Sequence, residues 1–246
     1  ALDSIQTSSL MLAAMNNHVA CMQILIKARA LVDAPGLAGE TALMYASKKG
    51  HVSCVQVLLD AKVNVNATNT GGVNALIRAS EHGNVDCVKL LMNAKADVRV
   101  KTTSQETALT RASEQGHAKV VRILIDCKAD IDAVTCGGST ALILAARYGQ
   151  FDSLRILIDA KADANVQAED EGSALIIAAA HNRPKSVQIL LDAKADVNSK
   201  DSDGVSNLFR VLSHNRTTCV KMLLDARADV DVVDRSGQTL LMKVSE

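Results

Sequence analysis

The sequence predicts an all-α solenoid, in which helix-turn-helix repeats stack on one another and are joined by β-hairpin-like loops. Three observations support this fold class: leucine recurs every 33 residues without insertion, Gly or Asn follows seven residues later, and a second leucine follows fifteen residues later. A fixed period of this length is the signature of a repeat architecture. Residues 1–246 are therefore expected to form a single domain of about seven full repeats and a partial C-terminal one. The recurring leucines are Leu10, Leu43, Leu76, Leu109, Leu142, Leu175, Leu208 and Leu241.

The first helix of a repeat is illustrated by the segment that begins at Thr41. Thr41 is a suitable N-cap, and Ala42, Leu43 and Ala46 form a face of mostly small residues at helical spacing. Gly50 ends this helix, because glycine tolerates the left-handed conformation found at helix C-termini. The corresponding residues elsewhere are Asn17, Gly83, Gly116, Gly149, Asn182 and Asn215.

The second helix begins near Val52 and ends near residues 60–62, with Val55 and Leu58 on its apolar side. Residues 63–67 alternate in polarity and are expected to be extended, and the Gly71-Gly72 pair to turn the chain into the next repeat. No single repeat could bury the apolar sides of both helices. Neighbouring repeats are therefore expected to cover one another.

These repeats resemble the ankyrin family, whose period is 33 residues. The matching runs are residues 39–46 (GETALMYA), 106–112 (ETALTRA) and 138–145 (GSTALILA), together with Gly50-His51 and Gly116-His117. The family's proline is replaced by alanine, as at Ala42, and its histidine by apolar residues such as Met44 or by Thr110. The resemblance implies that apolar packing replaces the family's threonine–histidine hydrogen bond.

A further departure concerns the glycine that usually ends the family's second helix. Cations stand there instead: Arg29, Lys62, Lys95, Lys128, Lys161, Lys194 and Arg227. A cation is favourable at a helix C-terminus. These side chains form either a basic ridge that contacts an acidic partner or, as we favour, a solvated row. Nearby aspartates such as Asp97 and Asp130 would balance such a row.

Composition excludes several classes of function. The 27 basic and 27 acidic residues give no net charge, which disfavours nucleic-acid binding. Aromatics are 2% of residues and no apolar run approaches the length of a membrane span, so we expect neither base-stacking platforms nor membrane insertion. The six cysteines contain no CxxC pair and suggest a reducing, intracellular location, most simply the cytoplasm.

Candidate metal and catalytic residues are weak. His18 and Cys21, like His51 and Cys54, stand three residues apart, but adjacent repeats lie about 8–10 Å apart, too far for one ion to collect ligands from both. Cys21, Cys54, Cys87 and Cys219 are instead expected to be buried as small apolar residues. No nucleophile, P-loop or metalloprotease motif is present. We therefore predict no catalytic residues, no metal and no cofactor.

The resemblance implies that partners bind to the inner face of the first helices and to the loop tips. Arginine and tyrosine are frequent anchors of interfaces, and this criterion favours the middle repeats. The candidate residues on the first helices are Tyr45, Lys48, Lys49, Arg78, His82, Arg111, Arg147 and Tyr148. Those at the loop tips are Glu40, Lys101, Glu106 and Val134.

Three functional hypotheses follow. The first is a non-catalytic scaffold that binds a partner peptide or domain. The second is the recognition arm of a larger enzyme, channel or ubiquitin-ligase adaptor, and the third a sensor whose basic side chains clasp a nucleotide or another small ligand. The chain is expected to be a monomeric fragment of a longer protein. Asn66, Asn165 and Asn198 resemble the asparagines that oxygen-dependent hydroxylases modify in ankyrin repeats.

Overall fold

The computed structural model describes residues 8–169, 172–212, 216–232 and 239. Asn215 and Leu241, two positions of the predicted period, lie outside these ranges. Contacts divide the chain into two compact units, an N-terminal unit of residues 1–130 and a C-terminal unit of residues 131–246. Each unit is described by itself.

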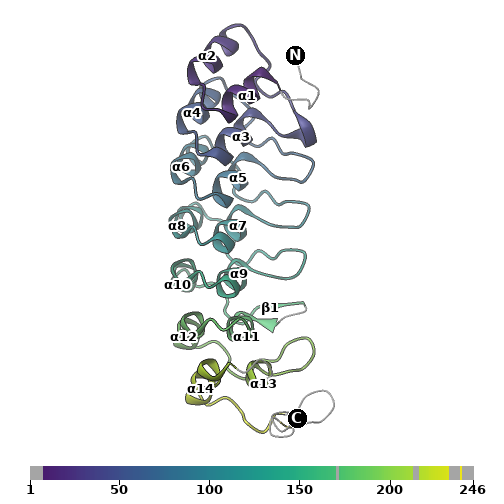
Figure 1. Ribbon diagram of the computed structural model, residues 1–246, viewed down its shortest axis with the longest axis vertical. Helices are drawn as coiled ribbons and strands as arrows, with labels where there is room; N and C mark the ends of the chain where they lie inside the picture. The colour runs from purple at the N-terminus through teal and green to yellow at the C-terminus, as the bar shows by residue number, and fades with distance from the viewer. Residues whose placement is uncertain (1–7, 170–171, 213–215, 233–238, 240–246) are drawn as a thin grey trace. The chain divides into compact units, whose positions relative to one another are not determined.

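The N-terminal unit contains two layers of helices (Figure 1). Within each layer, consecutive helices contact one another, and each first helix also contacts the second helix of its own repeat. A short 3₁₀ turn, Leu37–Gly39, lies in the first connecting loop. The first helices are α1 (Ser9–Met15), α3 (Ala42–Lys49), α5 (Ala75–Glu81) and α7 (Ala108–Gln115), and the second helices are α2 (Val19–Lys27), α4 (Val52–Asp60), α6 (Val85–Asn93) and α8 (Ala118–Asp126).

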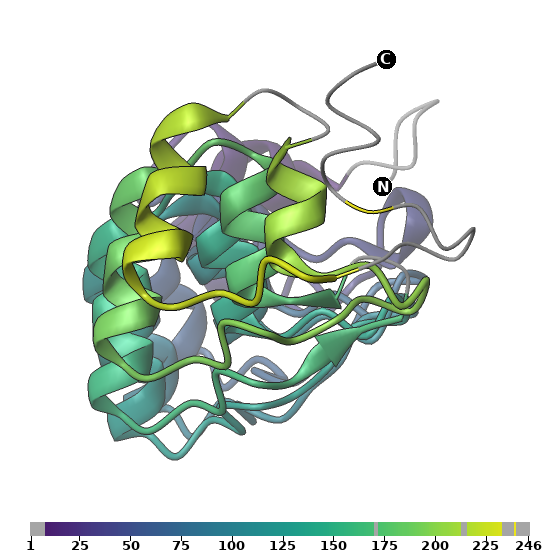
Figure 2. The same cartoon turned by 90° about the horizontal axis from the view of Figure 1, so that it is seen from below.

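The C-terminal unit repeats this arrangement, with loops that extend from the first helices on the side away from the second helices (Figure 2). One loop contains a short antiparallel strand pair, β1 (Gln167–Ala168) and β2 (Gly172–Ser173). Both units thus have the predicted all-α architecture of stacked helix pairs with hairpin-like loops. The first helices are α9 (Ala141–Tyr148), α11 (Ala174–Ala180) and α13 (Asn207–Leu212), and the second helices are α10 (Phe151–Asp159), α12 (Pro184–Asp192) and α14 (Thr217–Asp225).

The predicted N-cap and C-terminal glycine of α3 are confirmed. The Thr41 hydroxyl accepts a hydrogen bond from the backbone N–H of Met44, and Gly50 ends α3 with φ +73°. The side chain of Met44 is buried, so apolar packing replaces the family's histidine here. In α7 a hydroxyl remains: the Thr110 side chain accepts from the backbone N–H of Thr107 at 2.8 Å, which completes a capping box.

The cations that replace glycine after the second helices adopt a left-handed conformation. Their φ angles lie between +59° and +68°, as at Lys62 (+59°) and Lys161 (+68°). L-residues occupy this region at a cost, because Cβ approaches the following carbonyl oxygen. The cation therefore stands in a backbone position suited to glycine.

Side chains at the start of the second helices connect neighbouring repeats. The His51 Nε2 donates to the carbonyl oxygen of Met15 at 3.1 Å, and the His117 Nε2 donates to that of Glu81 at 3.1 Å. The equivalent Asn84 donates from Nδ2 to the carbonyl of Ser47 at 2.7 Å. These bonds satisfy carbonyl groups at the C-terminal ends of the first helices.

The loops are connected by a second set of hydrogen bonds, between positions 31 residues apart. In the N-terminal unit, the Asn66 side chain accepts from the backbone N–H of Asp97 at 2.8 Å. The Asp97 side chain in turn accepts from the backbone N–H of Arg99 at 2.9 Å. The same arrangement recurs in the C-terminal unit, where Asn165 accepts from Asp196 and Asn198 from Asp229. We call this set the loop seam.

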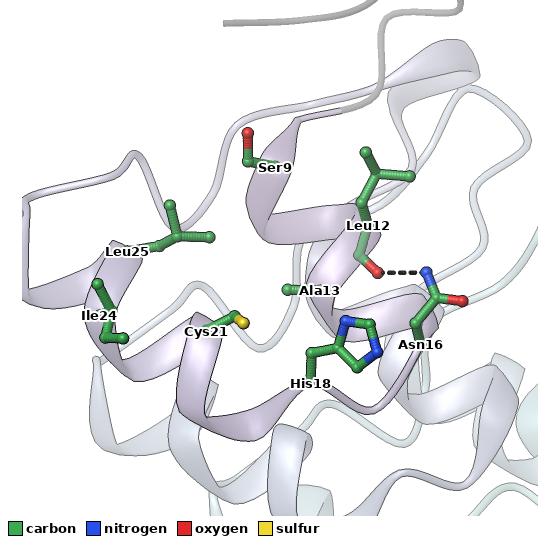
Figure 3. A pocket seen from close by; sticks show the side chains of 8 residues that line it. All are labelled: Ser9, Leu12, Ala13, Asn16, His18, Cys21, Ile24 and Leu25. Atoms are coloured by element: carbon green, nitrogen blue, oxygen red, sulfur yellow. Dashed lines mark hydrogen bonds between the residues drawn. The ribbon is translucent and has the colours of Figure 1, made fainter.

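Two details differ from the sequence-based expectations. Residues 63–67 alternate in burial as predicted, but they bend at a turn in which the N–H of Ala67 donates to the carbonyl of Asn64. Cys54, Cys87 and Cys219 are buried, whereas Cys21 is exposed. Cys21 lines an open cavity of about 510 Å³ on the face of α1 and α2 (Figure 3). The expectation of burial was wrong because it assumed that a preceding helix pair covers this face, and no described residues do so.

Candidate protein-binding surface

The candidate residues on the first helices occupy the positions that packing leaves open. The first helices bury their recurring leucine and the alanines on the same side, as Ala42 and Leu43 show in α3. Helical geometry then directs the residues two, five and six positions after the leucine away from the core. In the N-terminal unit, Tyr45 and Lys48 are half-buried, while Lys49 and His82 are exposed.

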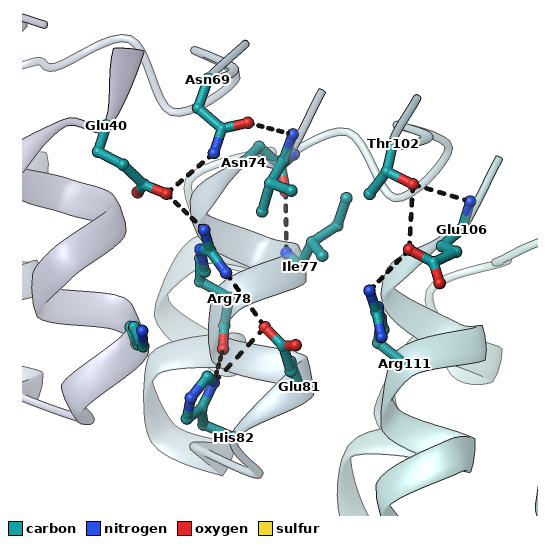
Figure 4. Close-up of polar contacts among 12 residues, drawn as sticks. Glu40, Asn69, Asn74, Ile77, Arg78, Glu81, His82, Thr102, Glu106 and Arg111 are labelled. Carbon is teal, nitrogen blue, oxygen red and sulfur yellow. Dashed lines mark hydrogen bonds and ion pairs between the residues drawn. The ribbon is translucent and has the colours of Figure 1, made fainter. Parts of the chain in front are cut away.

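Arg78 lies at the centre of the first polar cluster (Figure 4). Its guanidinium forms an ion pair with Glu40, which lies in the loop before α3, and a second with Glu81 at 3.4 Å. The Asn69 amide also donates to Glu40 at 2.9 Å. Burial acts to lower the pKa of Arg78, but the hydrogen bonds and charges of Glu40 and Glu81 outweigh it and raise that pKa.

Arg111 forms a second cluster one repeat further on (Figure 4). Its guanidinium contacts the Glu106 carboxylate at 2.8 Å and the Glu114 carboxylate at 3.2 Å. The Thr102 hydroxyl donates to Glu106 at 3.3 Å. Both arginines are thus held between two carboxylates, which fixes guanidinium groups that would otherwise sample many rotamers.

The two arginine clusters are negatively charged overall, although each is centred on an arginine. Two guanidinium groups face four carboxylates, so the two clusters together carry a formal charge of −2. A basic clasp for phosphate would need cations that are not already paired.

Tyr45 lies next to the first cluster. Burial raises the pKa of its hydroxyl, and the negative charge of Glu40 adds to this effect while Arg78 opposes it. Tyr45 therefore remains a neutral hydrogen-bonding group at physiological pH. Lys101, at a loop tip, is exposed, whereas Glu106 is half-buried because it packs against Thr102 and Arg111.

The remaining candidates, Val134, Arg147 and Tyr148, belong to the C-terminal unit. Val134 and Tyr148 are 42% and 45% exposed. Arg147 is half-buried, and its carbonyl accepts a hydrogen bond from the Nε of Arg183 at 3.3 Å. The structure thus separates the candidates into two groups, one in each unit.

Sequence reasoning missed three residues that adjoin Arg147 and Tyr148. Phe151 is exposed at the start of α10, and the Lys185 ammonium lies 5.3 Å from the centre of its ring. Arg183 completes the group through its bond to Arg147. A signal was present in the sequence. Arg183 and Lys185 place two cations at positions that hold the uncharged Gln150 and the acidic Asp152 in the preceding repeat.

The three candidate asparagines for hydroxylation are exposed and all belong to the loop seam. Asn66, Asn165 and Asn198 each accept a backbone N–H from the following repeat. Their modification stays a prediction.

Within residues 8–169, 172–212, 216–232 and 239, no group of three or more His, Cys, Asp or Glu side chains could hold a metal ion. In the same part of the chain, no helix has both the length and the apolar character needed to cross a membrane.

Comparisons with known proteins agree with this architecture. The family description "Ankyrin repeats (3 copies)" matches residues 10–102, 76–170 and 175–245. The crystal structure of the human ASB11 ankyrin repeat domain is similar in fold, with a TM-score of 0.82 and 23% sequence identity. That match covers 91% of this chain and 99% of the other. A search of curated protein sequences found no match. The family match spans nearly all of the repeats, and the chain therefore belongs to the ankyrin repeat family.

Proposed function

We propose that this chain is a non-catalytic, intracellular protein-interaction module. Ankyrin repeats are generally protein-interaction modules; the finer proposal is that the first helices and loop tips of the N-terminal unit bind a partner peptide or domain. One observation carries it: Arg78 and Arg111 are each held between two carboxylates on a surface that packing leaves open. Immobilised arginines beside a half-buried tyrosine can bind with little further loss of side-chain entropy.

The proposal is tested with the double substitution Arg78→Gln/Arg111→Gln. The matched control is Lys89→Gln/Arg122→Gln, which removes the same charge from the exposed side of α6 and α8 in the same unit. Proteins captured from a lysate by the unmodified chain are quantified by mass spectrometry for all three proteins. We expect a subset to be lost with the first pair and retained with the control.

Equal capture by all three proteins would show that this surface is not the binding site. Loss with both double variants would indicate a nonspecific charge effect and would also contradict the proposal. Circular dichroism of each variant establishes that the helices are intact before capture is compared.

A further inference from the structure

The C-terminal unit carries a distinct surface where its first helices turn into its second helices. We define the junction patch as Arg147, Tyr148, Phe151, Arg183 and Lys185. Two contacts pair four of its members: Arg183 reaches the carbonyl of Arg147, and Lys185 lies over Phe151. Tyr148 ends α9, three residues before Phe151. The patch lies wholly within the C-terminal unit.

The patch is more basic than the corresponding residues of the two repeats that precede it. Residues 147–152 and 180–185 contain three cations and one carboxylate, Asp152, which give a formal charge of +2. Residues 81–86 and 114–119, at the same positions of their repeats, contain three carboxylates and one lysine, which give −2. The repeat pattern therefore does not impose this positive charge, which recurs at residues 48–53 through Lys48 and Lys49.

The backbone at the patch holds Arg183 as it holds Asn84 and His117 at the equivalent positions of other repeats. Gly149 has φ +70°, and a Cβ added there would lie 3.1 Å from the Cδ of Arg183. The arginine side chain thus lies across the glycine, and its Nε is fixed by the Arg147 carbonyl. The exposed guanidinium of Arg183 is therefore oriented by the backbone around it and not by a carboxylate.

Aromatic groups give the patch an apolar component. Tyr148 and Phe151 are 45% and 36% exposed, and they are half of the four aromatic residues in the chain. Lys185 is exposed above the Phe151 ring, in a cation–π arrangement that keeps both groups at the surface. Exposed aromatics next to arginine are typical of the centres of protein interfaces.

We propose that the junction patch binds an acidic segment of a protein partner. Carboxylates of the partner would pair with Arg183 and Lys185, and an apolar side chain between them would pack on Tyr148 and Phe151. A protein segment is favoured over nucleic acid because a net charge of +2 neutralises few phosphates, whereas tight nucleic-acid binders contact about 6–10. The inference rests on the proposed interaction function, but it concerns the other unit.

The test uses the full chain and the fluorescein-labelled peptide Glu-Glu-Glu-Phe-Glu-Glu-Glu in fluorescence anisotropy. We expect saturable binding that weakens with added salt, and no binding of the peptide in which every Glu is Gln. The variant Arg183→Glu/Lys185→Glu should bind at least about tenfold more weakly, since it replaces attraction by repulsion. Phe151→Ser should weaken binding without changing the salt dependence.

The matched control is Lys161→Glu/Lys194→Glu. These exposed lysines follow the opposite ends of α10 and α12, so the net charge changes by the same amount in the same unit. Thermal unfolding of each variant checks its fold, and Arg183→Gln/Lys185→Gln provides a milder second variant. The control should bind like the unmodified chain.

Three results would overturn the inference. They are no binding of the acidic peptide by the unmodified chain, equal weakening by the control, and stronger binding of a labelled single-stranded oligonucleotide with the same loss on substitution. The last would assign the surface to nucleic acid. Because Arg78 and Arg111 are unchanged throughout, failure here leaves the test of the N-terminal unit independent.

Discussion

At the scale of the residue, the most unusual choice in this chain is a cation in left-handed backbone after every described second helix. Glycine would adopt these φ angles without steric cost, although it has more freedom to lose on folding. A lysine there places its charge near the helix C-terminus, where the dipole favours it. The two effects oppose one another, and for a single exposed lysine the steric cost of about 1–2 kcal/mol is the larger.

We therefore expect Lys95→Gly to stabilise the protein by up to about 1 kcal/mol, since the left-handed residue loses its Cβ. Urea unfolding measures the change. The control is Lys89→Gly in the middle of α6, where glycine should cost about 1 kcal/mol. The explanation would be wrong if both substitutions destabilised the chain equally.

Cys87 gives a pH-dependent prediction at the same scale. Desolvation by burial raises the pKa of its thiol to about 11, and the charge of Asp86 adds to this. The thiol ionises more readily in the unfolded chain, so its stabilising contribution is complete below pH 9 and is lost as the pH rises towards 11. The position accepts valine in another repeat, as Val120 shows.

Cys87→Val should accordingly lose less stability between pH 9 and 11 than the unmodified protein does. Urea midpoints of the two proteins, compared at several pH values, provide the measurement. Parallel curves across this range would show that the Cys87 thiol does not titrate differently on folding.

At the scale of the element, the loop seam depends on an acceptor side chain that recurs every 33 residues, with one exception. Asp33, Asn66, Asp132, Asn165 and Asn198 supply it, each accepting from a backbone N–H 31 residues later. At the corresponding position of the third repeat stands Arg99, whose side chain has no acceptor atom. The seam therefore lacks this side-chain acceptor opposite the N–H of Asp130.

Arg99→Asn should provide the missing acceptor and stabilise the protein by about 0.5–1.5 kcal/mol, the usual net contribution of a hydrogen bond. Asn66→Ala, which removes an existing acceptor, should destabilise it by a similar amount. Thermal unfolding of both variants tests the pair. A stabilising effect of Arg99→Ala as large as that of Arg99→Asn would point to loss of the arginine, not gain of the bond.

The elements also show how far the sequence alone could lead. Helix boundaries and caps such as Thr41 and Gly50 were predictable because they depend on local backbone chemistry. The ion pair between Glu40 and Arg78 was not, since it joins residues 38 positions apart through the placement of a loop. Lys185 over Phe151 was missed for the same reason, and Cys21 was misjudged because an equivalent position need not have an equivalent neighbour.

At the scale of the whole molecule, stability is expected to be local. Each helix pair packs on adjacent pairs within its unit, and in repeat proteins stability is approximately a sum of repeat and nearest-neighbour terms. That residues 1–246 form a single domain stays a prediction. If they do, a substitution that destabilises one repeat should also destabilise its neighbours, and the effect should decrease with distance along the chain.

Leu91 is fully buried in α6, and Leu91→Ala should cost about 2–5 kcal/mol. Amide hydrogen exchange should increase most in α4, α6 and α8 and least in α14. Leu190→Ala, in α12, is the counterpart in the C-terminal unit and should give the reverse order. Uniform acceleration over all helices would instead show one fully cooperative transition.

The loop seam has a mechanical consequence. Within each unit its hydrogen bonds follow one another along the edge of the loops, so a force that separates neighbouring loops loads them in series and not side by side. Bonds in series yield singly, at low force, and each can re-form while its neighbours hold. The buried leucines pack across the same boundaries between repeats, so they are loaded in series as well, and each unit is expected to open one boundary at a time.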